Sequence, residues 1–245
     1  MGDLETDFNL KVVLVNFKQC LNEKEEILMD HYLTCWRGLV SLGEAAPAPW
    51  RCVTQRPGQW LPQMRPLLPS CRFLNSLGTI FSFISKDVVT KLQIMERLRG
   101  GPQGGHYASL QSMVAYETSH QLVDLQGRSC HPDSGCRTVL RLHRALRWLQ
   151  LFLEGLRTSP EDARTSALCT DSYNASLAAY HPWIVRRAAT MAFCALPTRK
   201  VFLETMNVGS PEQAVEMLGE ALPFIEHVYD ISQKLYAEHA LLDLP

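Results

Sequence analysis

The chain has 245 residues, enough for one domain with a large core or two small ones, and we expect a single domain over residues 1–245. Its 24 lysines and arginines balance 25 aspartates and glutamates, which excludes a nucleic-acid binder that relies on net basic charge. The acidic N-terminal stretch shows no leader pattern, charges interrupt the apolar runs well before a membrane-spanning length, and the eight cysteines form no close pairs. We therefore expect a cytosolic protein with reduced thiols.

Apolar residues recur at helical spacing through most of the chain, and no stretch sustains the alternation that is typical of strands. The pattern predicts helices, in chain order, over residues 11–29, 77–98, 107–125, 136–156, 173–194 and 213–241. Clusters of glycine and proline predict the breaks, including one at His181 and Pro182. Ser210 followed by Pro211 is typical of a helix cap and first position. The sequence therefore predicts an all-α fold.

Residues 41–71 differ from their surroundings, because they hold six prolines and no apolar repeat. If the segment is removed, Val40 and Leu74 stand three positions apart and the apolar residues on both sides continue in helical phase. We expect this segment to be poorly ordered. One interpretation is an added segment, such as alternative or incorrect splicing would produce, within a helix that otherwise runs on. The other is a functional lid or a Pro-rich arm that binds a partner.

Two pairs of charges stand four residues apart, so each pair shares one helix face: Asp87 with Lys91, and Arg137 with Arg141. The simpler interpretation is two solvated faces, whose ion pairs contribute only about 0.3–0.5 kcal/mol. Apolar neighbours such as Val88 leave little room for a wholly wet face. The alternative is a site for a phosphate that is carried on an apolar body, since arginine and lysine bind phosphate through charge-assisted hydrogen bonds.

A histidine and a tryptophan flank the break near residue 182. His181 is either a cap or packed residue, or a neutral donor to a buried carbonyl. Trp183 and Ile184 precede Arg186 and Arg187, which suits an anchor at a membrane surface, since indoles settle among lipid head groups and arginines meet anionic phosphates. Packing of Trp183 in the core is the alternative.

Signals for an enzyme are weak. The chain has no nucleophile elbow, phosphate-binding glycine loop or dinucleotide fingerprint. The metal-like cluster Cys130, His131, Cys136 and His143 fits no standard zinc spacing, which leaves a helical metal-dependent hydrolase as a weak hypothesis.

Three stretches resemble the glycolipid transfer protein superfamily, and the resemblance extends over residues 1–40 and 72–245. They are RFLNSLGTIFSFISKD at residues 72–87, GCRTVLR at 135–141 and YNASLAAYHPW at 173–183. The resemblance implies a two-layer helical sandwich that encloses a lipid pocket, with no catalysis and no cofactor. It implies transfer of ceramide 1-phosphate or a related phosphosphingolipid between membranes. The alternative is a lipid sensor or lipid-gated interaction module that binds the same lipid without transferring it.

The resemblance also implies roles for individual residues. Asp87 would accept the amide N–H of the lipid, His181 would meet the acyl carbonyl, and Lys91, Arg137 and Arg141 would hold the phosphate in a wet cleft. The sugar-binding relatives have an asparagine at the position of Lys91 and a tryptophan at that of Arg141, and these two departures favour phosphate over sugar. We place Arg128 at the rim, and we expect the acyl chains among Leu77, Phe81, Ile84, Val88, Trp148, Phe152 and Leu177.

The expected setting is a monomer that binds no nucleic acid and touches anionic membranes through Trp183, Ile184, Arg186 and Arg187. For location, we expect the cytosol, with peripheral association to Golgi, endosomal and plasma membranes and with the nucleus left open.

Overall fold

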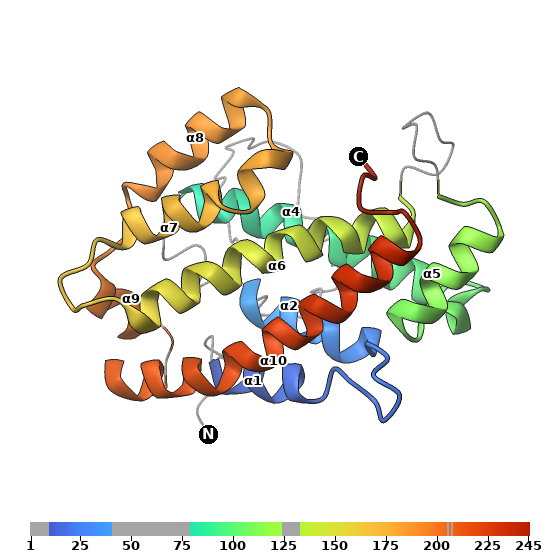
Figure 1. Ribbon diagram of the computed structural model, residues 1–245, viewed down its shortest axis with the longest axis horizontal. Coiled ribbons are helices and arrows are strands. Elements are labelled where there is room, and N and C mark those ends of the chain that lie inside the picture. The colour runs from blue at the N-terminus through green and yellow to red at the C-terminus, as the bar shows by residue number, and fades with distance from the viewer. Residues whose placement is uncertain (1–9, 41–78, 124–132, 205, 207) are drawn as a thin grey trace, which may run out of the picture.

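The computed structural model describes residues 10–40, 79–123, 133–204, 206 and 208–245, with the backbone alone at residues 10, 40 and 79–84 (Figure 1). The expectations for residues 41–71, Leu77 and Arg128, and for the side chains of Phe81 and Ile84, lie outside the described residues.

The described chain is helical, which confirms the all-α prediction, and its only extended pairing consists of isolated bridges from Leu21 to Ile27 and from Leu28 to Ser109. The helices are α1 (Leu10–Lys18), α2 (Met29–Val40), α4 (Thr79–Gly100), α5 (Leu110–Ser119), α6 (Gly135–Thr158), α7 (Thr165–Asn174), α8 (Trp183–Phe193), α9 (Arg199–Glu204) and α10 (Pro211–Glu238). Two short 3-10 turns are η1 (Gly104–Tyr107) and η2 (Leu177–Tyr180).

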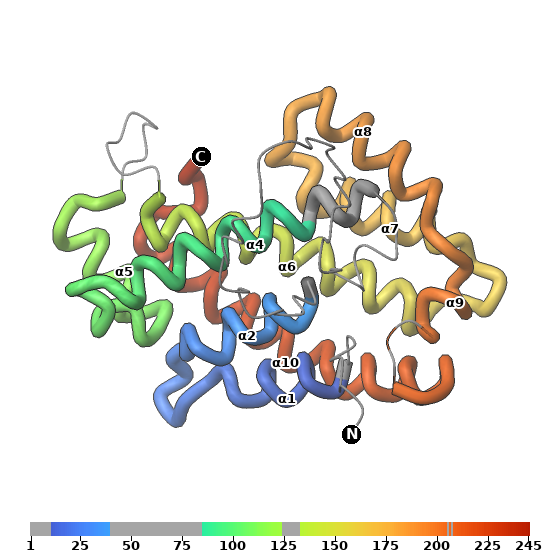
Figure 2. Tube along the Cα trace, turned by 180° about the vertical axis from the view of Figure 1, so that it is seen from behind, coloured from blue at the N-terminus to red at the C-terminus, as the bar shows by residue number. Residues whose placement is uncertain are grey.

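The helices form two layers around a common core. Both views place α1, α2 and the first half of α10 on one side and α4, α6, α7 and α8 on the other (Figures 1 and 2). The long helix α6 contacts α4, α5, α7 and α10, while α1 packs against α2 and α10. Because α6 contacts α10 of the other layer as well as helices of its own, its different faces carry residues into the core, toward η2 and to the surface beside α10.

The first turn of α6 is fixed by polar side chains. The Ser134 hydroxyl accepts the N–H of Arg137 at 3.3 Å. The carboxylate of Glu117, which is 1% exposed, accepts the N–H of Gly135 at 2.6 Å and of Cys136 at 2.9 Å. A Cβ at position 135 would stand 2.6 Å from the Met113 sulfur, so glycine permits this close approach. These contacts set the start of the helix that carries Arg137 and Arg141.

Helix α10 confirms the cap prediction. Ser210 is its N-cap, Pro211 follows at the first position, and Ser210 and Gln213 exchange hydrogen bonds in a capping box.

Three predicted helix ranges were wrong in part. The helix expected over 11–29 ends at Lys18, because the side-chain oxygen of Asn22 accepts the N–H groups of Lys24 and Glu26 at 2.9 Å and closes a turn instead. The range 107–125 holds a helix only over α5, where a Ser109–Ser112 capping box starts it and a left-handed φ of 53° at Gln121 follows its end.

The range 173–194 divides into the end of α7, η2 and α8. The break at His181 and Pro182 agrees with the prediction, whereas the break after Asn174 was not expected. None of the described helices combines the length and the apolar character that crossing a bilayer requires.

Candidate functional site

Helix α4 presents the predicted acid–base pair. The Lys91 ammonium lies 2.5 Å from the Asp87 carboxylate, one turn away. The Lys91 side chain is only 11% exposed and that of Asp87 is 58% exposed, while Val88 and Leu92 beside them are buried. The interpretation as a solvated face therefore fails for Lys91, whose charge lies close to the core and is met by a carboxylate that remains open to a ligand.

His181 joins this pair from the end of η2. Its ring is half-buried, and its Nδ1 lies 2.7 Å from the Tyr173 hydroxyl. Burial lowers the pKa of His181 below its ordinary value, Asp87 opposes this shift and Lys91 adds to it, so both charges act on the ring. Burial raises the pKa of Tyr173, which keeps its hydroxyl protonated. When that hydroxyl donates to Nδ1, the neutral imidazole carries its proton on Nε2 and can donate it to a carbonyl.

The arginines of α6 differ in exposure. Arg137 is 7% exposed, whereas Arg141 is exposed and its Nη2 donates to the carbonyl oxygen of Pro245 at 3.2 Å. The expectation that Lys91, Arg137 and Arg141 all stand in a wet cleft was therefore wrong for Lys91 and Arg137. The reason for Arg137 is its place in the first turn of α6, beneath the Ser134 cap.

Sequence reasoning missed Arg144 and Tyr180. Arg144 donates to the carbonyl oxygens of Leu242 at 2.7 Å and Leu244 at 2.9 Å, and its guanidinium lies 4.1 Å from the centre of the Tyr180 ring. The spacing of three residues after Arg141 was the available signal, since it keeps Arg144 near the same helix face.

The residues predicted to hold the acyl chains lie mostly in the core, as far as the structure describes them. Val88, Trp148 and Phe152 are buried and Leu177 is half-buried. Trp148 stacks on Phe152 and on Phe193, with ring centres 6.5 and 6.1 Å apart. Trp148 and Phe152 thus form an apolar wall of α6 that contacts Phe193 of α8 and Phe202 of α9.

Helix α8 presents an apolar surface to solvent. Trp183 is 67% exposed and Ile184 70% exposed, which makes the core-packing alternative for Trp183 wrong. Met191, 75% exposed, lies two helical turns further and was missed, although its spacing from Ile184 is that of one face. Arg186 and Arg187 are also exposed.

The metal hypothesis gains no support from the described residues. Cys130 and His131 lie outside them, and nowhere among the residues that are described do three or more histidine, cysteine or acidic side chains gather as a metal site would need. The other two members are engaged elsewhere. Burial raises the pKa of the Cys136 thiol, and the His143 ring bonds to Gln233.

An all-helical two-layer fold with an apolar interior and a cluster of cations, a carboxylate and a histidine at its edge defines a class of lipid carriers. The family model described as "Glycolipid transfer protein (GLTP)" matches residues 68–208, which is more than half of the chain. The chain belongs to the glycolipid transfer protein family, whose members carry lipids and are not enzymes.

Individual relatives are similar over their whole length. A Bos taurus protein named ceramide-1-phosphate transfer protein is 74% identical over 245 residues, with all of both chains covered. The crystal structure of the human ceramide-1-phosphate transfer protein with 12:0 ceramide-1-phosphate is 71% identical, covers 98% of this chain and all of its own, and superposes with a TM-score of 0.81. The apo form from mouse is 67% identical, with 97% of this chain and all of its own covered and a TM-score of 0.82.

Proposed function

We propose that this protein carries ceramide 1-phosphate from one membrane to another without making or breaking a covalent bond. The observation that carries the proposal is the cluster of Asp87, Lys91 and His181, in which an exposed carboxylate, a cation that is only 11% exposed and a neutral imidazole meet at the edge of an apolar core. The similarity to relatives named for this lipid, and to a human structure that binds it, supports the choice of lipid.

The proposed roles follow from hydrogen-bonding chemistry. The Asp87 carboxylate accepts the amide N–H, and the His181 ring donates to the acyl carbonyl. Lys91, Arg137 and Arg141 hold the phosphate, which requires Arg141 to exchange its bond to the backbone oxygen of Pro245 for a phosphate oxygen. Arg128 at the rim completes the proposed set.

The need for a protein carrier follows from the lipid's two chains. About 30 methylene groups at roughly 0.8 kcal/mol each make unaided departure from a bilayer cost on the order of 20 kcal/mol. In the proposed complex the chains lie between the layers, against the side of α6 that bears Trp148 and Phe152. The lipid chains replace contacts such as the stacking of Trp148 on Phe193 by protein–lipid contacts of the same apolar kind.

The proposed membrane contact is the start of α8. Trp183 and Ile184 enter the lipid surface, while Arg186 and Arg187 meet anionic phosphates. Replacing both Trp183 and Ile184 by alanine should weaken sedimentation with vesicles of phosphatidylcholine and phosphatidic acid at least fivefold and leave the melting temperature unchanged, since neither side chain is buried. Replacing Val201 of α9, an apolar side chain that is 44% exposed, by alanine is the control and should have no effect. We place the protein in the cytosol, as a monomer that binds no nucleic acid, with peripheral contact to Golgi, endosomal and plasma membranes.

A vesicle assay tests the proposal. Donor vesicles carry fluorescent ceramide 1-phosphate, acceptor vesicles carry none, and purified protein should raise the rate of transfer in proportion to its concentration. A fluorescent sugar-bearing ceramide should move at least tenfold more slowly. If the protein extracts ceramide 1-phosphate from donors and delivers none to acceptors, it is a lipid sensor or lipid-gated module instead. Binding of neither lipid would overturn both assignments.

A further inference from the structure

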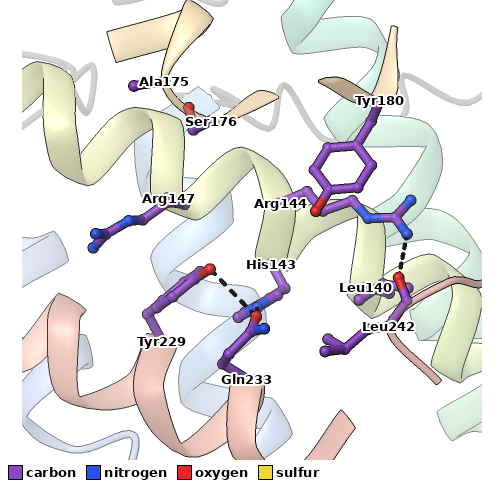
Figure 3. A pocket seen from close by; sticks show the side chains of 10 residues that line it. All are labelled: Leu140, His143, Arg144, Arg147, Ala175, Ser176, Tyr180, Tyr229, Gln233 and Leu242. Carbon is purple, nitrogen blue, oxygen red and sulfur yellow. Dashed lines mark hydrogen bonds between the residues drawn. The ribbon is translucent and has the colours of Figure 1, made fainter. Parts of the chain in front are cut away.

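A polar cavity lies beside α6, and neither Asp87 nor Lys91 lines it. It has a volume of about 190 Å³ and is enclosed by α6, the end of α7, η2, α10 and Leu242 (Figure 3). A water molecule needs about 10–15 Å³ by the same measure, so the cavity has room for a group larger than one water. Tyr180 and His181 are adjacent in the chain but belong to different sites. The Tyr180 ring contacts Arg144, whereas the charges of Asp87 and Lys91 act on the pKa of His181.

The cavity wall is cationic. Arg144 and Arg147 contribute guanidinium groups from successive turns of α6, and none of the described residues that line it carries a carboxylate. Asp243 acts on Arg144 and Asp230 acts on His143 from outside the lining, so the positive charge is offset only in part. Both arginines are half-buried, and each lies over an aromatic ring, that of Tyr180 or Tyr229. Stacking holds both guanidinium planes in place before a ligand arrives.

Two buried polar atoms of the lining residues have no hydrogen-bond partner in the part of the chain that the structure describes. The first is the N–H at Arg144 Nε, and the second is Nδ1 of His143, whose side chain is 2% exposed. The other ring nitrogen of His143, Nε2, lies 2.7 Å from the amide oxygen of Gln233, which also accepts the hydroxyl of Tyr229 at 3.3 Å. An amide oxygen only accepts, so Nε2 must carry the ring proton and Nδ1 is a bare acceptor. Burial lowers the pKa of His143 to about 4, which keeps the ring in this neutral form.

The unused donor and the unused acceptor define the ligand that fits. An unpaired buried polar group is costly, so a ligand that pairs both is favoured. The two guanidinium groups of the lining favour an anion, and a ligand that pairs both atoms accepts from Arg144 and donates to His143. A deprotonated carboxylate or a sulfate only accepts. A phosphate that keeps one proton does both, because its charged oxygens accept and its P–OH donates.

We propose that this cavity, bounded by Arg144, Arg147, His143, Gln233, Tyr229 and Tyr180, binds a monoprotonated phosphate group separately from the lipid head-group site. The group comes either from free inorganic phosphate or from a phosphomonoester head group at a membrane. Its occupation strengthens the existing contact of Tyr180 with Arg144, and through the next residue it holds His181 in the orientation that the lipid carbonyl needs.

Nuclear magnetic resonance of the lipid-free, full-length chain tests the proposal. Inorganic phosphate is titrated at pH 7 and constant ionic strength, and the amide signals of His143 and the side-chain amide of Gln233 are followed. We expect saturable shifts at both. Arg147→Gln should raise the dissociation constant for phosphate at least fivefold. Arg157→Gln, on the same helix but paired with Glu154, should leave it unchanged. Sulfate should bind at least threefold more weakly than phosphate, because it has no proton to donate.

The variant Arg141→Leu separates the two sites, since it removes the head-group contact and should leave the shifts at His143 and Gln233 intact. Vesicles of phosphatidylcholine with phosphatidic acid, compared with free phosphate, show which source the cavity accepts. The proposal is overturned if neither source shifts His143 and Gln233, if Arg147→Gln binds phosphate as wild type does, if Arg141→Leu abolishes the shifts, or if sulfate and phosphate bind equally. None of these results bears on transfer of ceramide 1-phosphate, which the vesicle assay measures by itself.

Discussion

Arg141 is the exposed member of the proposed phosphate set, so it can be changed with little risk to the fold. Arg141→Leu removes a charge-assisted contact of the kind worth about 1.5–3 kcal/mol. Transfer of ceramide 1-phosphate should therefore fall at least about tenfold. The measurement is vesicle transfer together with thermal melting, and Arg157→Leu serves as the control because Arg157 lies on the same helix with a partner of its own, Glu154. Undiminished transfer by folded Arg141→Leu would remove Arg141 from the phosphate site.

Asp87 should act on every sphingolipid, whatever its head group, because its proposed partner is the amide N–H that they share. Asp87→Val leaves that N–H without an acceptor, a loss of about 1–3 kcal/mol, and should weaken binding of plain ceramide and of ceramide 1-phosphate alike. Asp87→Asn keeps an acceptor oxygen and should bind both lipids better than the valine variant. Equilibrium binding to both lipids is the measurement. If only the phosphate lipid is lost, the role of Asp87 is to hold the Lys91 ammonium, which lies 2.5 Å away.

At the scale of single elements, the start of α6 is held by a buried carboxylate that is not among the proposed lipid-binding residues. Glu117 accepts two N–H groups at the start of α6 and the Tyr107 hydroxyl at 3.1 Å. Glu117→Gln replaces one acceptor oxygen by a donor, which leaves an N–H of α6 unpaired at a cost of about 1–3 kcal/mol. The melting temperature should fall by several degrees. Affinity for ceramide 1-phosphate should fall as well, because Arg137 stands in the first turn of that helix.

The exposed Glu96 of α4 provides the matched control, since Glu96→Gln changes the same group without touching α6. A Glu117→Gln protein that melts earlier yet binds the lipid as wild type does would show that the carboxylate supports the fold alone.

The sequence allowed the long helices to be predicted, because α6 and α10 combine sustained apolar spacing with clear end signals such as Ser210 and Pro211. It misplaced the shorter ones, because a local side-chain bond such as that of Asn22 to the backbone can end a helix whose apolar spacing continues.

At the site, spacing correctly joined Asp87 with Lys91, whereas the approach of His181 depends on how η2 folds back on α6. The burial of Arg137 and the stacking of Arg144 on Tyr180 could not be predicted from the sequence, because both arise from packing between elements.

At the scale of the whole molecule, residues 41–71 fall in the sequence between α2, which ends at Val40, and α4, which begins at Thr79. We propose that deletion of residues 41–71 raises both stability and transfer. Deletion brings Val40 next to Arg72, which continues the apolar face of α2 in phase toward α4 and removes six prolines, each costing about 3 kcal/mol if forced into a helix. A shorter connection also loses less chain entropy on folding.

Thermal melting and vesicle transfer of the full chain and the deletion protein provide the test, with hydrogen exchange on the full chain beside them. The expected result is a higher melting temperature and faster transfer for the shorter protein, and rapid exchange throughout residues 43–69. Replacing the same 31 residues by a glycine–serine linker of equal length is the control, since it removes the prolines but not the length and should give an intermediate melting temperature. A lower melting temperature on deletion, or slow exchange within residues 43–69, would show that the segment belongs to the fold. Removing a segment lowers the stability of the rest of the protein only if the segment makes contacts or hydrogen bonds with it.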